Sequence, residues 1–391
     1  MQTSLLDSLA NKVGASAVQQ KSWELLSEIG LPQKKSESYK YTPITAILQK
    51  NINWELEHDF SVEHEFFYKE EGSHLVFSNG VFQKESSKIK SDLSIQFGEV
   101  SEGKHDPFSL LNQSLAPGEL VITAGTKFPV FVYHFNSAGI ANPRIKVKVE
   151  DGASIRLYEK LISSRQVNTF TNSYVEYEVG RNAFAYHTKV QNYHENVYSH
   201  ETVVADVQSD SHFYNNTYSF DAALIRNNLV INLDGENCEG HMYGVFILDK
   251  NVHVDNNTSV DHLKPHSYSN ELYKGILDEK STGVFNGKIY VRQDAQKTNA
   301  FQSNNNILLS DEATIHTKPQ LEIWADDVKC SHGCTSGQLD EDAIFYLRAR
   351  GINEKSAKAM ILNAFAVETM QHIGAKTVEE EVKSYIQQKL S

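Results

Sequence analysis

Two cysteines and a histidine stand within five residues of one another in the C-terminal part of the chain: Cys330, His332 and Cys334. In an extended segment, Cys330 and His332 project from one face and lie about 7 Å apart at the rise of a strand. A thiolate and an imidazole so placed can bind one iron or zinc ion, or two irons of a cluster. Cys334 could join them only if the backbone bends at Gly333, which glycine permits. All three residues are therefore candidate metal ligands.

The ligand set is incomplete within this segment. Structural zinc takes four ligands and iron–sulfur clusters usually take four thiolates, whereas Cys238 is the only other cysteine in the chain. A cysteine in a strand can also serve only as a small buried hydrophobe. Either the motif is a packing feature, or a partner chain completes the site.

The residues around this motif resemble the signature of the SufB/SufD family of iron–sulfur cluster assembly proteins, over residues 325–333, 337–342 and 345–352. The Lys-Cys-Ser-His-Gly form at 329–333 and the short chain resemble the SufD branch of the family. Cys334 is a departure, because the family usually has alanine there. The resemblance extends to other segments, namely residues 283–287, residues 295–300, and Leu31, Pro32, Glu37 and residues 39–42 near the N-terminus.

This resemblance implies a right-handed parallel β-helix and a non-catalytic scaffold subunit, acting in cluster assembly and iron acquisition. It implies that the β-helix pairs with that of SufB, and that the C-terminal helices dock the ATPase SufC. Cys330 and His332 would then hold a nascent Fe–S cluster at the SufB interface, with no cofactor bound stably by the isolated chain. The sulfur-accepting cysteine is attributed to SufB, so Cys238 is interpreted as a buried turn or core residue. An uncovered β-helix edge could also pair two copies into a homodimer.

Composition limits the other functions. The 391 residues contain 37 Lys and Arg against 50 Asp and Glu, a formal net charge of -13. An acidic chain without a basic block is a poor nucleic-acid binder. The N-terminal residues lack the pattern of a signal peptide, and no run approaches the ~20 apolar residues of a membrane span. We therefore expect a cytoplasmic protein with no membrane partner, in a compartment where thiols stay reduced.

The hydrophobic pattern divides the chain into three parts. Residues 1–115 are predicted to be mostly helical, with a short hairpin at Asn79–Gly80. Residues 116–335 alternate in the period of strands, with asparagine pairs and a single proline between Pro143 and Pro319. This pattern fits a mainly β, parallel β-helix core with coils of about twenty residues, and the family resemblance favours that fold. A β-sandwich is the structural alternative. Residues 336–391 are predicted to form a helical domain that docks the ATPase, with Gly333–Gly337 as the linker before it.

Two further sequence features and two other functions bear on the interpretation. Gly283 and Gly287 miss the spacing of a phosphate loop and are predicted to be turn residues. His253 and Asp255 share a strand face, but satisfied pairing is favoured over metal binding. Two functions of other classes remain open, an exported β-helical polysaccharide-active enzyme and a stand-alone zinc-binding β protein. The first needs an open groove of carboxylates and export, and the second needs four ligands from one chain.

Overall fold

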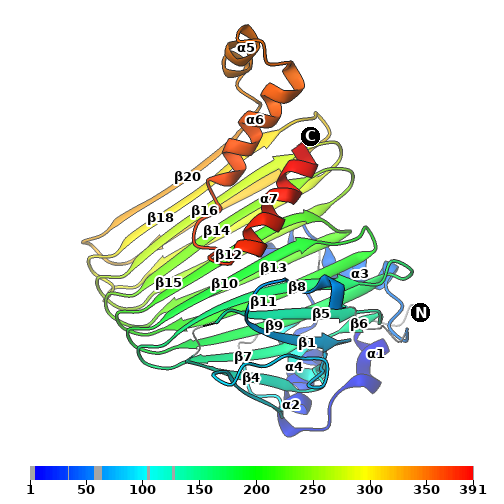
Figure 1. Cartoon of the computed structure of the whole chain (residues 1–391). Helices are drawn as coiled ribbons and strands as arrows, with labels where there is room; N and C mark the ends of the chain where they lie inside the picture. Colours follow the sequence, from blue (N-terminus) through cyan, green and yellow to red (C-terminus); the bar gives the residue numbers. More distant parts are fainter. Residues whose placement is uncertain (1–4, 34, 57–63, 104–105, 126–127, 391) are drawn as a thin grey trace.

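A two-sheet parallel β-solenoid forms the centre of the computed structural model, which describes residues 5–33, 35–56, 64–103, 106–125 and 128–390 (Figure 1). Sheet A contains, in spatial order, β2 (Val81–Phe82), β1 (Ser73–Ser78), β5 (Val130–Asn136), β8 (Ser154–Ser163), β10 (Phe184–Asn192), β12 (His212–Asp221), β14 (Glu239–Leu248), β16 (Tyr268–Leu277), β18 (Asn299–Leu308) and β20 (Lys329–Gly337). Sheet B contains β3 (Ser94–Gly98), β4 (Glu119–Ala124), β7 (Arg144–Val149), β9 (Thr169–Val179), β11 (Val197–Val207), β13 (Leu224–Leu233), β15 (His253–His262), β17 (Thr282–Val291) and β19 (Thr314–Ile323), and β6 (Ile140–Ala141) pairs with β9. The predicted parallel β-helix is confirmed.

The chain alternates between the two sheets, so each coil contributes one strand to each of them. Positions 212, 239, 268, 299 and 329 share one register on neighbouring strands of sheet A, which gives 27 to 31 residues per coil. The prediction of about twenty residues was wrong, because a coil holds two strands of about ten residues and two turns. The turns before β14, β16 and β18 place Asn237, His266 and Lys297 at positive φ.

The asparagine pairs of the sequence lie partly in the stacked interior. Asn227 of β13 donates from Nδ2 to Oδ1 of Asn256 in β15 at 3.0 Å, at the same register. The two glycines predicted in turns, Gly283 and Gly287, instead lie within β17, so that prediction was wrong. A Cβ at Gly283 would come within 2.8 Å of the Phe246 ring, and one at Gly287 within 2.2 Å of the Gln302 amide. These glycines therefore provide space for neighbouring side chains.

Helices and 3₁₀ turns from the N-terminal region cover part of sheet B. They are α1 (Leu5–Leu9), α2 (Ala17–Ile29), α3 (Ile44–Asn51) and α4 (Pro107–Leu115), with 3₁₀ turns at Ala10–Lys12 and Glu37–Tyr39. The 3₁₀ turn at His64–Phe66 instead places Phe66 against Phe135 of sheet A. Phe108 of α4 packs with Phe170 of β9 and Tyr198 of β11 in one apolar cluster. The predicted hairpin is confirmed, with β1 and β2 antiparallel around Asn79 and Gly80, and β1 also pairs with β5.

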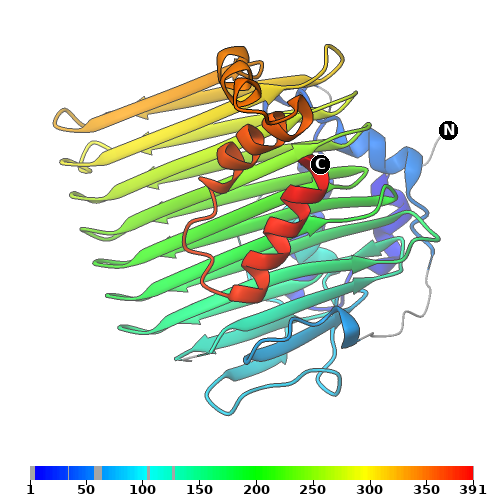
Figure 2. The same cartoon turned by 45° about the horizontal axis from the view of Figure 1, so that its top comes forward.

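The C-terminal segment forms α5 (Glu341–Ala349), α6 (Glu354–Val367) and α7 (Lys376–Leu390). Asp340 and Asn353 cap the first two helices with their side chains, as their residue types predict. Helix α7 lies across the outer face of sheet A and buries Val378, Val382 and Ile386 there (Figure 2). Helix α5 projects beyond the solenoid (Figure 1). Among the described residues, no helix is long and apolar enough to span a membrane.

Candidate functional site at the C-terminal end of the solenoid

Strand β20 carries all three candidate ligands. It pairs in parallel with β18 without interruption, and places Cys330 beside Ala300, His332 beside Gln302 and Cys334 beside Asn304. The prediction that Gly333 to Gly337 form a linker was wrong, because β18 offers hydrogen-bonding partners along this whole segment and glycine can adopt the extended conformation. No bend at Gly333 is needed, since alternate residues of one strand share a face.

This shared face is the interior side of the solenoid. Ala300, Gln302 and Asn304 on β18 are all buried, and paired positions on adjacent strands point the same way. Among the described residues, no further coil follows β20, so the three side chains line the end of the solenoid. Cys334 shows the geometry directly, because its Sγ lies 3.2 Å from Thr317 Oγ1 on β19 of the opposite sheet.

The three candidate ligands differ in exposure. Cys330 is half-buried against the apolar cluster of Ile289, Val291, Ala295, Ala300 and Ala325, and this burial raises the pKa of its thiol. His332 and Cys334 are exposed. A cysteine binds a metal ion as a thiolate, so metal binding at this thiol would release a proton. His332 and Cys334 are accessible from outside the chain.

Both sheets end here in long edges. Within the described part of the chain, β19 and β20 pair with no further strand on their outer sides. The edges span ten and nine residues and carry unpaired backbone groups. Such edges are templates for another strand. Exposed Ile323 and Trp324 follow at the end of β19, with 40% and 50% of their surfaces accessible.

Sequence reasoning missed the interior residues that lie below His332. Glu271 of β16, Gln302 of β18 and His332 of β20 share one register and one face. Gln302 Nε2 donates to Glu271 Oε2 at 2.6 Å, and both side chains are buried. Desolvation raises the pKa of Glu271 to about 7. These residues meet only through the register of neighbouring strands. A single sequence without a strict repeat does not define that register, so no local pattern could have identified them.

The remaining residues singled out in the sequence lie elsewhere, and each has at least one hydrogen-bond partner. Cys238 is fully buried and its Sγ donates to the Gly235 carbonyl at 2.9 Å, while burial raises its pKa to about 11. The expectation that Cys238 is buried is confirmed. His253 Nε2 lies 2.9 Å from Thr42 Oγ1, and Asp255 Oδ2 accepts from Thr42 and Arg226. These contacts tie the N-terminal segment to sheet B.

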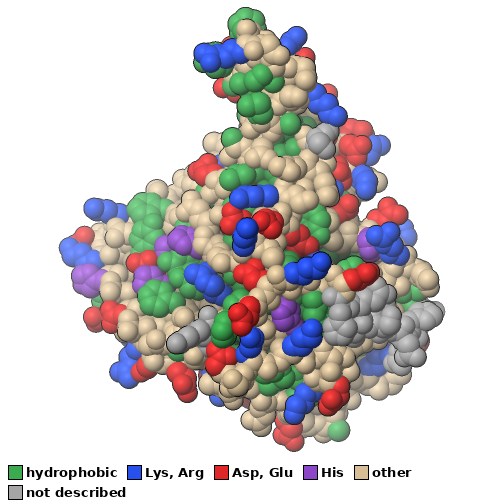
Figure 3. Space-filling view, in the orientation of Figure 1, with side chains coloured by type: hydrophobic (Ala, Val, Ile, Leu, Met, Phe, Trp, Pro, Cys, Tyr) green, Lys and Arg blue, Asp and Glu red, His purple; other side chains and the backbone are tan. Residues whose placement is uncertain are grey.

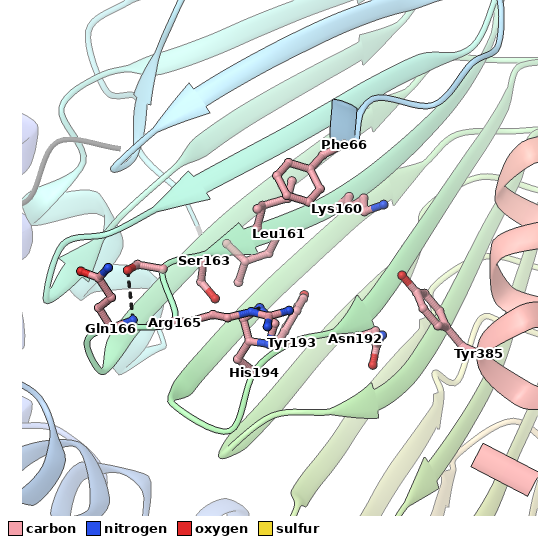
Figure 4. Close-up of a pocket in the computed structure, with 12 residues that line it drawn as sticks. Phe66, Lys160, Leu161, Ser163, Arg165, Gln166, Asn192, Tyr193, His194 and Tyr385 are labelled. Atoms are coloured by element: carbon pink, nitrogen blue, oxygen red, sulfur yellow. Dashed lines mark hydrogen bonds between the residues drawn. The ribbon is translucent and has the colours of Figure 1, made fainter. Parts of the chain in front are cut away.

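A separate pocket lies beside α7 on the outer face of sheet A, with a volume of about 460 Å³ (Figure 4). Phe66, Arg165, His194 and Tyr385 are among its lining residues, and Arg165 donates from Nε to His194 Nε2 at 3.0 Å. Lys160 in its wall is already paired with Glu381 at 2.6 Å. The pocket includes none of the residues that the sequence indicated.

Comparison with known proteins identifies the fold and its relatives. Residues 133–365 match the family described as SUF system FeS cluster assembly, SufBD core domain. The chain is 30% identical to the iron-sulfur cluster assembly protein SufD of Escherichia coli, over 93% of this chain and 90% of that protein. It is also 30% identical to a SufBD family protein of Synechocystis, over 93% and 88%, and 27% identical to the chloroplastic protein ABCI7 of Arabidopsis thaliana, over 79% and 68%.

Proposed function

The chain belongs to the SufBD family of SUF-system iron–sulfur cluster assembly proteins, and from that premise we propose that it is the SufD-type scaffold subunit. The family assignment favours cluster assembly over the polysaccharide-active enzyme and the stand-alone zinc protein. In this role the chain is not itself an enzyme. It supplies part of an assembly site, and ATP hydrolysis belongs to a SufC partner.

One observation carries this proposal. Cys330 and His332 lie on β20, the last strand of sheet A among the described residues. The unpaired edge of β20 and these two side chains are therefore open to the same partner chain. A SufB β-helix placed against β19 and β20 would pair with these edges and bring further ligands over the open end. The interface and the completed site are therefore one feature.

The chemistry assigned to each residue follows from its exposure. His332 is the accessible imidazole and binds iron, which here is cargo of the assembly reaction. Cys330 is the second ligand, and its raised pKa means that iron binding must displace its proton. Cys334 lies on the same strand face as both and serves as a third ligand in this proposal. The isolated chain offers too few ligands at this edge to retain a cluster.

The C-terminal helices are the proposed docking surface for SufC. Phe345, Tyr346 and Met360 on α5 and α6 are 73%, 55% and 51% exposed. Hydrophobic side chains of this part gather on the projecting end of the molecule (Figure 3). Large exposed apolar groups at a projecting end are typical of a protein interface. When SufB is absent, the β20 edge could pair two copies of the chain.

The test is cluster assembly in the complex co-purified with SufB and SufC. We expect His332→Ala to lower the iron and sulfide content per complex by at least about tenfold, with the complex itself intact. Ser331→Ala is the matched control, because Ser331 lies on the same strand and points to the opposite face. An unaltered cluster content in His332→Ala would remove the proposed role of the open end.

A further inference from the structure

Three potential metal ligands meet on the outer face of sheet A, far along the chain from β20. His212 opens β12 and Glu239 opens β14, and these two residues are register partners on adjacent strands. His241 follows Glu239 by two positions, so it projects from the same face. One nitrogen of each imidazole and one carboxylate oxygen all lie within 4.8 Å of one another. Strand pairing therefore brings the three groups together.

The two imidazoles converge on a single carboxylate oxygen. His241 Nε2 lies 2.8 Å from Glu239 Oε2, and His212 Nδ1 lies 3.1 Å from the same atom. Within the described part of the chain, the buried Nδ1 atoms of His212 and His241 make no hydrogen bond. His212 Nδ1 thus faces the carboxylate at close range without a hydrogen bond, and a cation between the two atoms would satisfy both.

The side chains around the cluster hold it in position. The Tyr214 ring stacks on His241 at 4.4 Å, and Tyr186 stacks on Tyr214 at 4.6 Å. The Arg156 guanidinium covers the far side of Tyr186 at 3.7 Å from its centroid, so two aromatic rings separate its charge from His241. Imidazoles held in position by surrounding contacts are well oriented to bind a metal ion.

The loop between α6 and α7 covers this cluster. The Arg156 side chain donates to the His372 carbonyl at 3.1 Å, and Tyr158 donates to the Ile373 carbonyl at 2.6 Å. The His372 ring lies 4.8 Å from the Tyr214 ring and 6.4 Å from the His241 ring. Figure 3 shows histidine side chains among hydrophobic ones on the left of this face. The open side of the ligand set thus faces the base of the C-terminal helices.

We propose that His212, Glu239 and His241 bind a divalent transition-metal ion on the outer face of sheet A. Two imidazoles and one carboxylate form a ligand set used by zinc, and also by iron(II). Ligand atoms 2.0–2.2 Å from a tetrahedral ion lie roughly 3.3–3.6 Å apart, so both nitrogens would move slightly away from Glu239 Oε2, which side-chain rotation allows. The fourth position faces His372. The ion would connect the solenoid to the α6–α7 loop, and the isolated chain would then hold one metal, contrary to the expectation from sequence.

The experiment uses the full chain carrying Cys330→Ser, His332→Ala and Cys334→Ser, stripped of metal and titrated with Co²⁺. These changes remove the β20 ligands, so the result does not depend on the proposed assembly site. We expect one saturable Co²⁺ with visible ligand-field bands and no thiolate charge-transfer band, displaced by Zn²⁺. Glu239→Gln and His241→Ala should each weaken binding by at least about tenfold.

The control is His266→Asn, which removes an exposed histidine outside the cluster and keeps a residue that tolerates its positive φ. It should bind Co²⁺ as the parent does. Zn²⁺ should also raise the melting temperature of the parent chain and not that of His241→Ala, since binding to the folded state stabilises it. Absence of saturable binding in the parent, or equally tight binding by Glu239→Gln and His241→Ala, would overturn the proposal.

Discussion

Replacing Glu271 with glutamine should remove a pH dependence of stability that is built into the last coils. Glu271 is only 1% exposed and its carboxylate accepts from Gln302 Nε2 at 2.6 Å. Desolvation raises its pKa to about 7, from an ordinary value of 4.5. The folded state therefore holds a proton that the unfolded state releases between these two values.

The sign of the effect follows from proton linkage. A raised carboxyl pKa contributes stability that is fully present below pH 4.5 and is lost as the pH rises through about 7. Each tenfold change in proton affinity corresponds to about 1.4 kcal/mol, so the loss amounts to about 3 kcal/mol between these limits. Glutamine keeps the acceptor for Gln302 and carries no proton to release.

The assay is urea unfolding of the wild-type chain and Glu271→Gln, followed by tryptophan fluorescence between pH 5 and pH 8. The free energy of unfolding of the variant should rise relative to that of the wild type by about 2–3 kcal/mol across this range, because only the wild type loses the stability linked to Glu271. All other titrating groups are common to both chains. Parallel stability curves for the two chains would refute the reasoning that Glu271 takes up a proton on folding.

Two further predictions concern the anchoring of the tail and the three thiols. Ile386→Ala on α7 should lower the free energy of unfolding in urea by about 2–5 kcal/mol, because Ile386 is fully buried against sheet A. The control Gln387→Ala, on the exposed side of the same helix, should leave the free energy of unfolding nearly unchanged. A disulfide reagent at pH 8 should modify Cys334 first, Cys330 more slowly and Cys238 last, because burial raises the pKa of Cys330, and raises that of Cys238 to about 11. Rapid modification of Cys238 in a Cys330→Ser, Cys334→Ser chain would contradict this order.

The sequence was sufficient to predict whether most segments form helices or strands. Alternation predicted the strands of the core, and Asp340 and Asn353 predicted two helix starts, because these signals are local. Glycine led to wrong predictions of turns and a linker where tertiary contacts determine the backbone conformation. Gly283 and Gly287 lie in a strand because neighbouring side chains occupy the space beside them, and Gly333 is extended because β18 pairs with it.

The candidate site was only partly predictable for a related reason. Cys330 and His332 could be identified because they are two residues apart in the chain. Gln302 and Glu271 lie beside them only through strand register, at separations of 30 and 61 positions from His332. His212 and Glu239 likewise meet across 27 positions. Without a strict repeat, no local pattern specifies which residues stack in successive coils.

The two ends of the solenoid differ in a way that supports assembly at one of them. At the N-terminal end, sheet A finishes with the two-residue strand β2 and sheet B with β3, and both are antiparallel to their neighbours. Short or reversed edge strands discourage further pairing. At the other end, β19 and β20 are long and parallel, and the C-terminal helix α7 packs on the side of sheet A instead of covering them. A solenoid normally needs a cap at each end. Within the described residues the tail does not provide the second cap, so under the proposed function a partner placed on β19 and β20 would complete both the fold and the proposed ligand set on β20.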